Sequence, residues 1–236
     1  MGKLLKALWV CWFYFTFSVL FIIYLVPFVP MMKWKWSHNF LHFLRRWITK
    51  LQLLLAGVII RKRIEGELPA PGAVFCFNHS SLLDILIPIA SLNRQIRFIG
   101  KKELGRIPLF GIVFQHLDIP IDRESSIRAH ETLEQVADCL HQGIDIFIAP
   151  EGTTSVNAPE MLPFKGGAFR LAEKAQVPIV PVVFLDNWRL FHYDKQWHGR
   201  PGFYRMHLLR PIAPSTQEGM KVKTREAMNR VLYVVS

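Results

Sequence analysis

A histidine and an aspartate five residues apart, His79 and Asp84, are the residues of this chain best suited to acid–base chemistry. A histidine can take a proton from a hydroxyl group near neutral pH, and a carboxylate beside it can hold the imidazole in the required tautomer. No Gly-x-Ser-x-Gly motif accompanies the pair. The pattern therefore favours removal of a proton from an acceptor hydroxyl without a covalent intermediate on the protein.

The spacing of the pair sets a condition on the elements that carry it. Five residues apart on one helix, the two side chains would point about 140° away from each other. They can meet only if His79 lies in a turn after a strand and Asp84 lies on the first turn of the following helix. Asn78, Ser80 and Ser81 favour such a turn or cap. The alternatives are a simple helix cap, or a serine hydrolase that lacks a recognisable nucleophile elbow.

Three further groups stand near the ends of predicted strands, where α/β folds place their sites. Lys101-Lys102, with Ile121-Asp122-Arg123, suits a phosphate monoester, which a guanidinium can bind through two hydrogen bonds. The loop 150–155 has a glycine for close approach and hydroxyls for polar oxygens. The segment 177–181 contains two prolines and suggests an edge strand or pocket wall rather than a central strand.

In this order and spacing the four groups resemble the membrane-bound glycerolipid acyltransferases, the family of the 1-acyl-sn-glycerol-3-phosphate acyltransferases. That family carries His-x-x-x-x-Asp, a Gly…Ile-Asp-Arg block, Pro-Glu-Gly-Thr-Arg and a Val-Pro-x-x-Pro strand. The resemblance runs from Gly66 to about Leu185, and Phe164-Lys165-Gly166-Gly167 resembles the basic and glycine step after the third block.

The resemblance implies transfer of a fatty acyl group from acyl-acyl-carrier protein or acyl-CoA to 1-acyl-glycerol-3-phosphate, which gives phosphatidic acid in phospholipid synthesis. It implies that His79 is the catalytic base and Asp84 its orienting partner. No metal and no cofactor besides the thioester donor is expected. The residues that it assigns to substrate binding are Lys101, Arg123, Glu151, Gly152, Thr153 and Lys165.

One departure from the family pattern concerns the acceptor. This chain has Thr154 where the family usually has arginine. A missing guanidinium leaves open whether the acceptor is lysophosphatidic acid or another lyso-lipid, such as lyso-ornithine lipid. A non-catalytic lipid-binding protein is a third possibility, which the intact His79 and Asp84 argue against.

The net charge of +11 is concentrated at the N-terminus. No Asp or Glu precedes Glu65, whereas ten Lys and Arg do, and the rest of the chain has 19 basic and 18 acidic residues. Basic residues that flank apolar segments favour an anionic lipid surface. Nucleic acid is not an expected partner, because no nucleic-acid motif is present.

Residues 1–60 are interpreted as a membrane anchor and 61–236 as the acyltransferase domain. Leu4 to Val29 is long and apolar enough for a membrane helix, and a cleaved signal peptide is disfavoured by its length. His38 to Ile60 is predicted as a basic amphipathic helix in the membrane interface, with a core helix as the alternative. The implied location is the membrane, at the cytoplasmic face of the inner (plasma) membrane, while the topology of these helices stays open.

From Arg61 on, short apolar strands alternate with helices, which predicts an α/β fold with a mixed, largely parallel sheet flanked by helices. The expected strands are 72–77, 96–99, 144–149 and 177–184. The expected helices are 82–89, stopped near Pro88, 126–142 and 166–175. The three cysteines are far apart, without metal-ligand spacing.

Overall fold

The fold is built on one mixed sheet of seven strands. The structure is a computed structural model that describes residues 2–122, 132, 136–192 and 197–235. The strand order is β1-β7-β6-β2-β5-β3-β4, and every neighbouring pair is parallel except β6 and β7. The strands are β1 (Val58–Ile64), β2 (Val74–Phe77), β3 (Ile96–Lys101), β4 (Ile119–Ile121), β5 (Asp145–Ile148), β6 (Ile179–Phe184) and β7 (Gly202–Leu208). The predicted fold class is confirmed.

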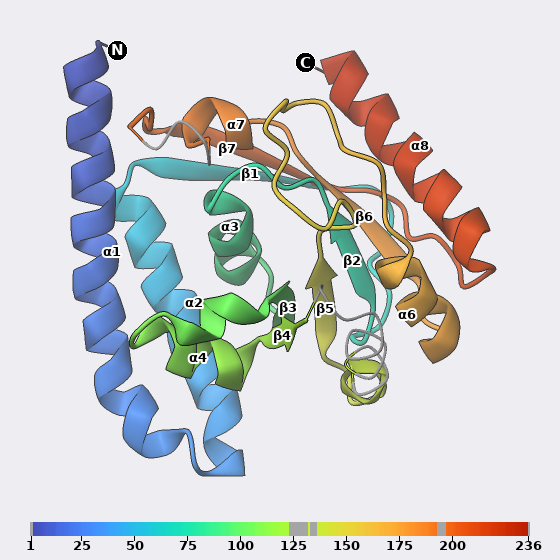
Figure 1. The fold of residues 1–236 in the computed structure, drawn as a ribbon, viewed down its shortest axis with the longest axis horizontal. Coiled ribbons are helices and arrows are strands. Elements are labelled where there is room, and N and C mark those ends of the chain that lie inside the picture. The colour runs from blue at the N-terminus through green and yellow to red at the C-terminus, as the bar shows by residue number, and fades with distance from the viewer. Residues whose placement is uncertain (1, 123–131, 133–135, 193–196, 236) are drawn as a thin grey trace.

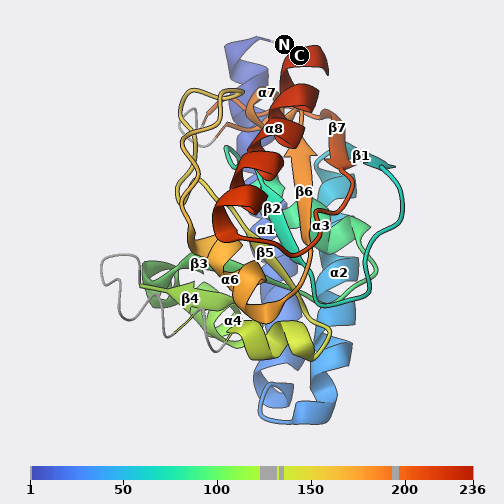
Figure 2. The same ribbon diagram turned by 90° about the vertical axis from the view of Figure 1, so that its right-hand side faces the viewer.

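Helices cover both faces of this sheet. Figure 2 shows α8 and α6 in front of the sheet and α1 and α2 behind it. Strand β2 is buried on both sides, with Phe75 and Phe77 packed toward α3 and with Val74 and Cys76 packed toward α6. The helices are α1 (Lys3–Met31), α2 (His38–Leu55), α3 (Leu83–Ser91), α4 (Phe110–Leu117), α6 (Gly167–Ala175), α7 (Asn187–Leu190) and α8 (Gln217–Val235), with 3-10 turns η1 (Lys35–Ser37) and η2 (Lys102–Arg106).

The N-terminal helices form an antiparallel hairpin along one side of the molecule (Figure 1). One face of α1 packs on the domain: Trp9 donates from Nε1 to the carbonyl of Ala56, and Phe13 stacks edge-on against Phe191. The opposite face is an exposed apolar stripe that includes Leu4, Leu8, Phe15, Ile22 and Val26. Among the described residues α1 is the one helix long and apolar enough to cross a membrane, and a third of its most apolar window is buried.

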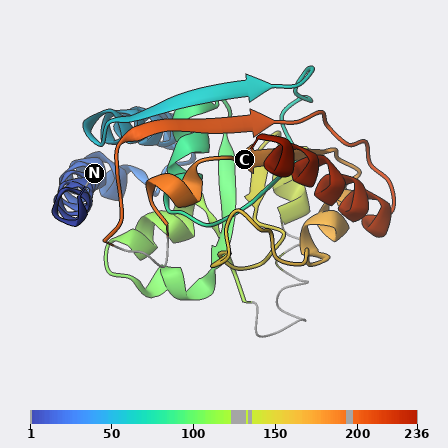
Figure 3. The ribbon, with the colours of Figure 1, turned by 90° about the horizontal axis from the view of Figure 1, so that it is seen from above.

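The predicted division at residue 60 stays a prediction, but the local elements differ from expectation. Helix α2 ends at Leu55, not at Ile60, because Gly57 takes a positive φ of 66° and turns the chain into β1. Figure 3 shows β1 and β7 side by side along one edge of the sheet.

Two predictions about prolines are wrong. Pro88 does not stop its helix, since α3 continues to Ser91. Pro88 lacks a backbone N–H and so removes one hydrogen bond from the helix. The helix continues because its side chains are buried, with Ile87 and Ile89 in the core. Strand β6 is not an edge or a wall: it lies between β7 and β2 and is buried throughout. The Pro181 carbonyl accepts from Leu209, just beyond the end of β7, so the missing N–H of Pro181 faces a position outside the ladder.

The other predicted elements are confirmed to within a few residues. The predicted helix 126–142 is helical where it is described without gaps, over residues 136–141. Its remaining part falls largely outside the described residues. The strands β4 and β7 and the helices α4, α7 and α8 had no sequence prediction, and neither did β1, whose first residues fall in the predicted helix 38–60.

Candidate active site

His79 and Asp84 meet in the geometry that their spacing requires. His79 lies in the turn between β2 and α3, and Asp84 is the second residue of α3. Nδ1 of His79 is 2.9 Å from Oδ2 of Asp84. With Nδ1 bonded to a carboxylate, the ring proton belongs on Nδ1 and the lone pair on Nε2. The imidazole is partly exposed, so Nε2 is the nitrogen available to a substrate hydroxyl.

Neutral donors, rather than a cation, stabilise the carboxylate of Asp84. Its side chain is fully buried, and Oδ2 also accepts the backbone N–H groups of Ser80 at 2.8 Å and Ser81 at 2.9 Å. No Lys or Arg pairs with it among the residues that the structure describes. Hydrogen bonds therefore hold the aspartate in place without cancelling its charge.

Two further donors to Asp84 come from positions that sequence reasoning missed. Tyr204 on β7 donates its hydroxyl to Oδ1, and Asn187 on α7 lies 3.4 Å from Oδ2 through Nδ2. Burial, together with the charge of Asp84, raises the pKa of Tyr204, so its proton stays in this bond. The alternation of buried and exposed residues in 202–208 could have predicted a strand, but nothing in the sequence links residues 187 and 204 to residue 84.

The loop 150–155 holds the main chain of His79 from both sides. Oε1 of Glu151 accepts the His79 N–H at 3.2 Å, and the N–H of Ser155 donates to the His79 carbonyl at 2.7 Å. Oε2 of Glu151 accepts the N–H of Leu162 at 2.7 Å. Burial raises the pKa of Glu151 although both bonds favour its ionised form. Both oxygens of the Glu151 carboxylate therefore accept backbone N–H groups, and the substrate-binding role that the resemblance implies stays a prediction.

Asn78 fixes the start of the same turn. Its side chain donates to the carbonyl of Phe184 at 3.0 Å and accepts the Phe184 N–H at 2.8 Å. This pair of bonds extends the contact between β2 and β6 beyond the last paired residue of β2, Phe77. The turn that carries His79 is thus tied to the end of a central strand.

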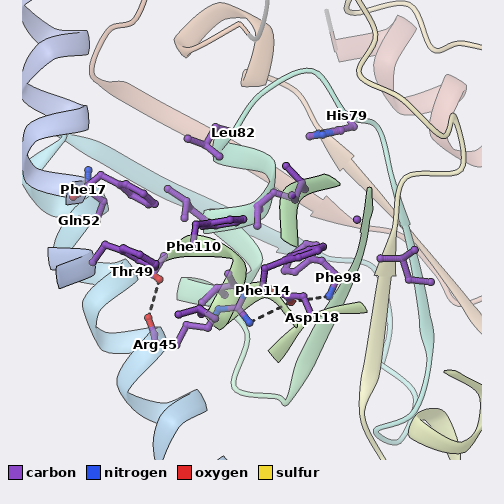
Figure 4. A pocket seen from close by; sticks show the side chains of 18 of the residues that line it. Phe17, Arg45, Thr49, Gln52, His79, Leu82, Phe98, Phe110, Phe114 and Asp118 are labelled. Carbon is purple, nitrogen blue, oxygen red and sulfur yellow. Dashed lines mark hydrogen bonds and ion pairs between the residues drawn. The ribbon is translucent and has the colours of Figure 1, made fainter. Parts of the chain in front are cut away.

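A largely apolar cavity of about 410 Å³ opens beside His79. Side chains from α1, α2, α3 and α4 line it, and Lys101, Thr153 and Thr154 line its polar part. In Figure 4, His79 lies on one side of the cavity's aromatic side chains, and Arg45 and Asp118 lie on the other. The aromatic and aliphatic lining includes Phe17, Phe21, Leu82, Phe98, Phe110 and Phe114. A chamber of this size and polarity suits a hydrocarbon chain.

The other predicted substrate-binding residues lie in different places. Lys101 and Thr153 share the cavity with His79. Gly152, at φ 74°, lies against the side chain of Lys165, whose Nζ is 3.1 Å from the position that a Cβ on Gly152 would take. That pair is outside the cavity lining. Arg123 lies outside the described residues.

No group of three His, Cys, Asp or Glu in the described parts of the chain is placed to hold a metal ion. Near Lys101, the neighbouring Lys102 is engaged with Asp122, with Nζ 2.8 Å from Oδ2. Lys101 itself is more than half exposed, and its ion pair with Glu103 is long, with Nζ 3.8 Å from Oε2. Of the two basic residues of the cavity lining, Lys101 is therefore the more exposed, whereas Arg45 is paired with Asp118.

Known proteins share both this fold and this sequence pattern. The structure of the 1-acyl-sn-glycerophosphate (LPA) acyltransferase PlsC from Thermotoga maritima superposes with a TM-score of 0.82, covers 100% of this chain and 98% of that one, and is 22% identical. At that identity the likeness establishes the fold.

Curated relatives are more similar in sequence. A 1-acyl-sn-glycerol-3-phosphate acyltransferase of Helicobacter pylori is 36% identical over 58% of this chain and 58% of its own length. That of Haemophilus influenzae is 32% identical over 66% of this chain and 65% of its own length. The human alpha enzyme is 31% identical over 80% of this chain and 70% of its own. The chain thus matches a little under two thirds of the two bacterial relatives.

The sequence model of the family described as Acyltransferase matches residues 59–185, a range that begins in β1 and ends just after β6. It contains the turn with His79, the first turn of α3 with Asp84, and the loop that holds the main chain of His79. This chain belongs to the acyltransferase family.

Proposed function

We propose that this protein transfers a fatty acyl group from a thioester to the free hydroxyl of a lysophospholipid, with lysophosphatidic acid as the acceptor. The observation that carries the proposal is the position of Nε2 of His79 at an apolar cavity of about 410 Å³. A base that opens onto a chamber for a hydrocarbon chain suits acyl transfer better than chemistry on a small polar molecule. Three curated relatives are named for this activity.

The reaction follows from the tautomer that Asp84 imposes. Nε2 of His79 takes the proton of the acceptor hydroxyl as its oxygen attacks the thioester carbonyl, and a C–O bond forms. The carbonyl oxygen becomes negative in the tetrahedral intermediate, and the imidazolium is stabilised by Asp84. Collapse of the intermediate breaks the C–S bond, and the imidazolium returns its proton to the thiolate. The products are the diacyl lipid and the free thiol of the carrier protein or coenzyme A.

The cavity and the basic residues each bind a different substrate. In this proposal the apolar chamber holds the fatty acyl chain of the donor. The phosphate of the acceptor contacts Lys101, and Thr153 and Thr154 offer hydroxyl groups at the same rim. Because position 154 lacks a guanidinium, we expect weaker recognition of the phosphate than an arginine there would give.

In this proposal the exposed apolar stripes on α1 and α2 hold the protein at the membrane. Both helices present large apolar side chains away from the domain, among them Ile22 and Val26 on α1 and Phe43 and Trp47 on α2. We propose that these stripes lie in one leaflet, so that a lysophospholipid reaches His79 from the membrane while the soluble donor approaches from the cytoplasm.

Membranes that contain the wild type, His79→Ala or His198→Ala test the proposal. Acyl-acyl-carrier protein and acyl-CoA would each be offered with lysophosphatidic acid, lyso-ornithine lipid and lysophosphatidylcholine. We expect phosphatidic acid from the wild type and from the exposed-histidine control His198→Ala, and none from His79→Ala. Equal acylation by His79→Ala would disprove the catalytic assignment. Product from lyso-ornithine lipid alone would support acyl transfer but show that the acceptor is lyso-ornithine lipid and not lysophosphatidic acid.

A further inference from the structure

A second hollow, of about 180 Å³, lies between α2 and the segment that joins α3 to β3. We call it the basic hollow. Its lining is mainly polar and contains no Asp or Glu, in contrast to the apolar cavity beside His79. Its polar lining residues, apart from the shared Arg45, are Asn39, His42, Arg46, Asn93, Arg94 and Gln95.

One positive charge in the basic hollow is uncompensated. Arg45 pairs with Asp118, and Arg94 pairs with the buried Asp145. Arg46, in contrast, has no carboxylate within salt-bridge distance among the residues that the structure describes. Its guanidinium hydrogen-bonds to the neutral side-chain oxygen of Asn93 and lies 3.5 Å from the carbonyl of Leu92. An anion that enters the hollow would therefore meet a guanidinium still lacking a counter-charge.

The basic hollow borders the part of α2 that we assign to the membrane. Phe43 lines the hollow and is itself half exposed, and Trp47 lies one turn further along the same exposed stripe. At about 100° per residue, Arg46 is roughly 60° around the helix from Phe43. A helix whose apolar stripe rests among acyl chains holds such a flanking basic residue at the level of the headgroups.

We propose that the basic hollow binds the phosphate of an anionic membrane phospholipid, held by Arg46 and the amide groups beside it. The hollow offers a charged fork, amide donors and no opposing carboxylate, and it stands where headgroup phosphates lie. A free phosphate ion shares this chemistry, but the neighbouring apolar stripe favours a lipid. This site is distinct from the proposed reaction site: the hollow shares Arg45 and Ile89 with the cavity of His79, but His79 itself is not part of its lining.

Asn93→Asp is the most direct variant, because it separates binding from folding. An aspartate at position 93 keeps an oxygen for the Arg46 guanidinium and supplies the counter-charge that the hollow lacks. If Arg46 only joins α2 to the end of α3, the variant leaves the protein intact and changes nothing else. If the hollow binds phosphate, the variant cancels its charge. Arg46→Gln is the second variant, and Lys50→Gln, one turn away and outside the hollow, is the control with the same loss of charge.

The experiment uses the full chain in neutral dodecyl maltoside micelles without acyl donor, at constant ionic strength. Calorimetric titrations would be made with dihexanoyl phosphatidylglycerol, dihexanoyl phosphatidylcholine and inorganic phosphate. We expect phosphatidylglycerol to bind at least tenfold more tightly than the other two. Asn93→Asp and Arg46→Gln should each weaken that binding about tenfold, as the loss of one charge-assisted contact predicts. Lys50→Gln should stay within twofold of the wild type.

Three results would overturn the proposal. The first is phosphatidylglycerol binding that Asn93→Asp leaves unchanged, since that lipid would then sit elsewhere. The second is an equal loss in Lys50→Gln, which would indicate general electrostatic attraction. The third is equal affinity for inorganic phosphate and for phosphatidylglycerol, which would show that the hollow does not recognise a lipid. Thermal unfolding of Asn93→Asp in the same micelles verifies that its fold is retained, so the outcome does not depend on Arg46→Gln being stable.

Discussion

Two buried aspartates near the same cavity are stabilised in different ways. Asp84 is bound by His79, two backbone N–H groups, Tyr204 and Asn187, and no Lys or Arg in the described part of the chain pairs with it. Asp118 accepts from both Nη atoms of Arg45, at 2.8 and 3.3 Å, and from the N–H of Phe98 at 3.0 Å.

The difference indicates what each aspartate can do. A guanidinium cancels the charge of Asp118, so that residue joins α2 to the region of β3 and has little charge left to offer a ligand. Neutral donors fix Asp84 without cancelling its charge, which in the proposed reaction stabilises the imidazolium. A buried carboxylate that pairs with no Lys or Arg of the described residues is therefore the better marker of the proposed catalytic end of this cavity.

The largest effect is expected from Asp84→Asn. The amide keeps the shape of the side chain but favours the wrong tautomer of His79, and we expect kcat to fall by roughly 10³–10⁴-fold, as in other histidine–aspartate pairs. Measurement of phosphatidic acid formation at saturating substrates tests this. Retention of more than a tenth of wild-type kcat would show that Asp84 does not orient the base.

Asp118→Asn should lower the free energy of unfolding and leave kcat nearly unchanged. The substitution leaves Arg45 unpaired in a site where its side chain is 13% exposed, and we expect a loss of about 3 kcal/mol in the free energy of unfolding. Thermal and denaturant unfolding measure this loss. The double variant Arg45→Met/Asp118→Leu should recover most of it, while kcat stays within about threefold. A thousandfold loss of kcat in Asp118→Asn would abolish the distinction between the two aspartates.

Tyr204→Phe tests how much one neutral hydrogen-bond donor to Asp84 contributes to kcat. The change leaves Oδ1 of a fully buried carboxylate without its side-chain donor, and we expect kcat to fall about tenfold with KM unchanged. The matched control is Tyr24→Phe, which removes a buried hydroxyl from the lining of the same cavity, where it donates to the carbonyl of Leu41 and not to Asp84. Equal kcat losses in both variants would point to a general effect on packing.

Asp186→Asn should have the smallest effect, because the Arg205 side chain that pairs with this third aspartate is one third exposed to solvent. Burial alone would raise the pKa of Asp186, but hydrogen bonds from Arg205 outweigh it and lower the pKa below its usual range. A lowered pKa stabilises the fold above pH about 4, and this contribution is lost as pH falls through the folded-state pKa. We expect the variant to be less stable by about 1 kcal/mol at pH 7 and to match the wild type near pH 2. A pH-independent difference in thermal unfolding would contradict this.

The contact between His79 and Asp84 was predictable from sequence because its geometry is local. A strand, a turn with Ser80 and Ser81, and the first turn of a helix bring positions 79 and 84 together without help from the rest of the fold. Asn187, just after β6, reaches Asp84 through the pairing of β2 with β6, and Tyr204 reaches it through the further pairing of β6 with β7. No local pattern encodes a contact across more than a hundred residues.

Backbone hydrogen bonding limits what the sequence indicates at two positions. For Glu151, the sequence indicates a carboxylate near the site but not which N–H groups it accepts from, and its role in substrate binding stays a prediction. For Pro181, whose predicted position at an edge is wrong, the sequence indicates a missing donor but not which neighbour that position faces.

The packing of α1 on the domain has a consequence for handling the protein. Phe17 and Phe21 of α1 form part of the chamber wall, and Trp9 and Phe13 belong to the main hydrophobic core. A shortened version that begins at β1, made to obtain a water-soluble catalyst, would open the chamber to solvent and uncover the core beneath it. The hydrophobic N-terminus is therefore part of the folded domain and cannot be removed like an affinity tag, and we expect the full chain with its exposed apolar stripe to need detergent or lipid during purification.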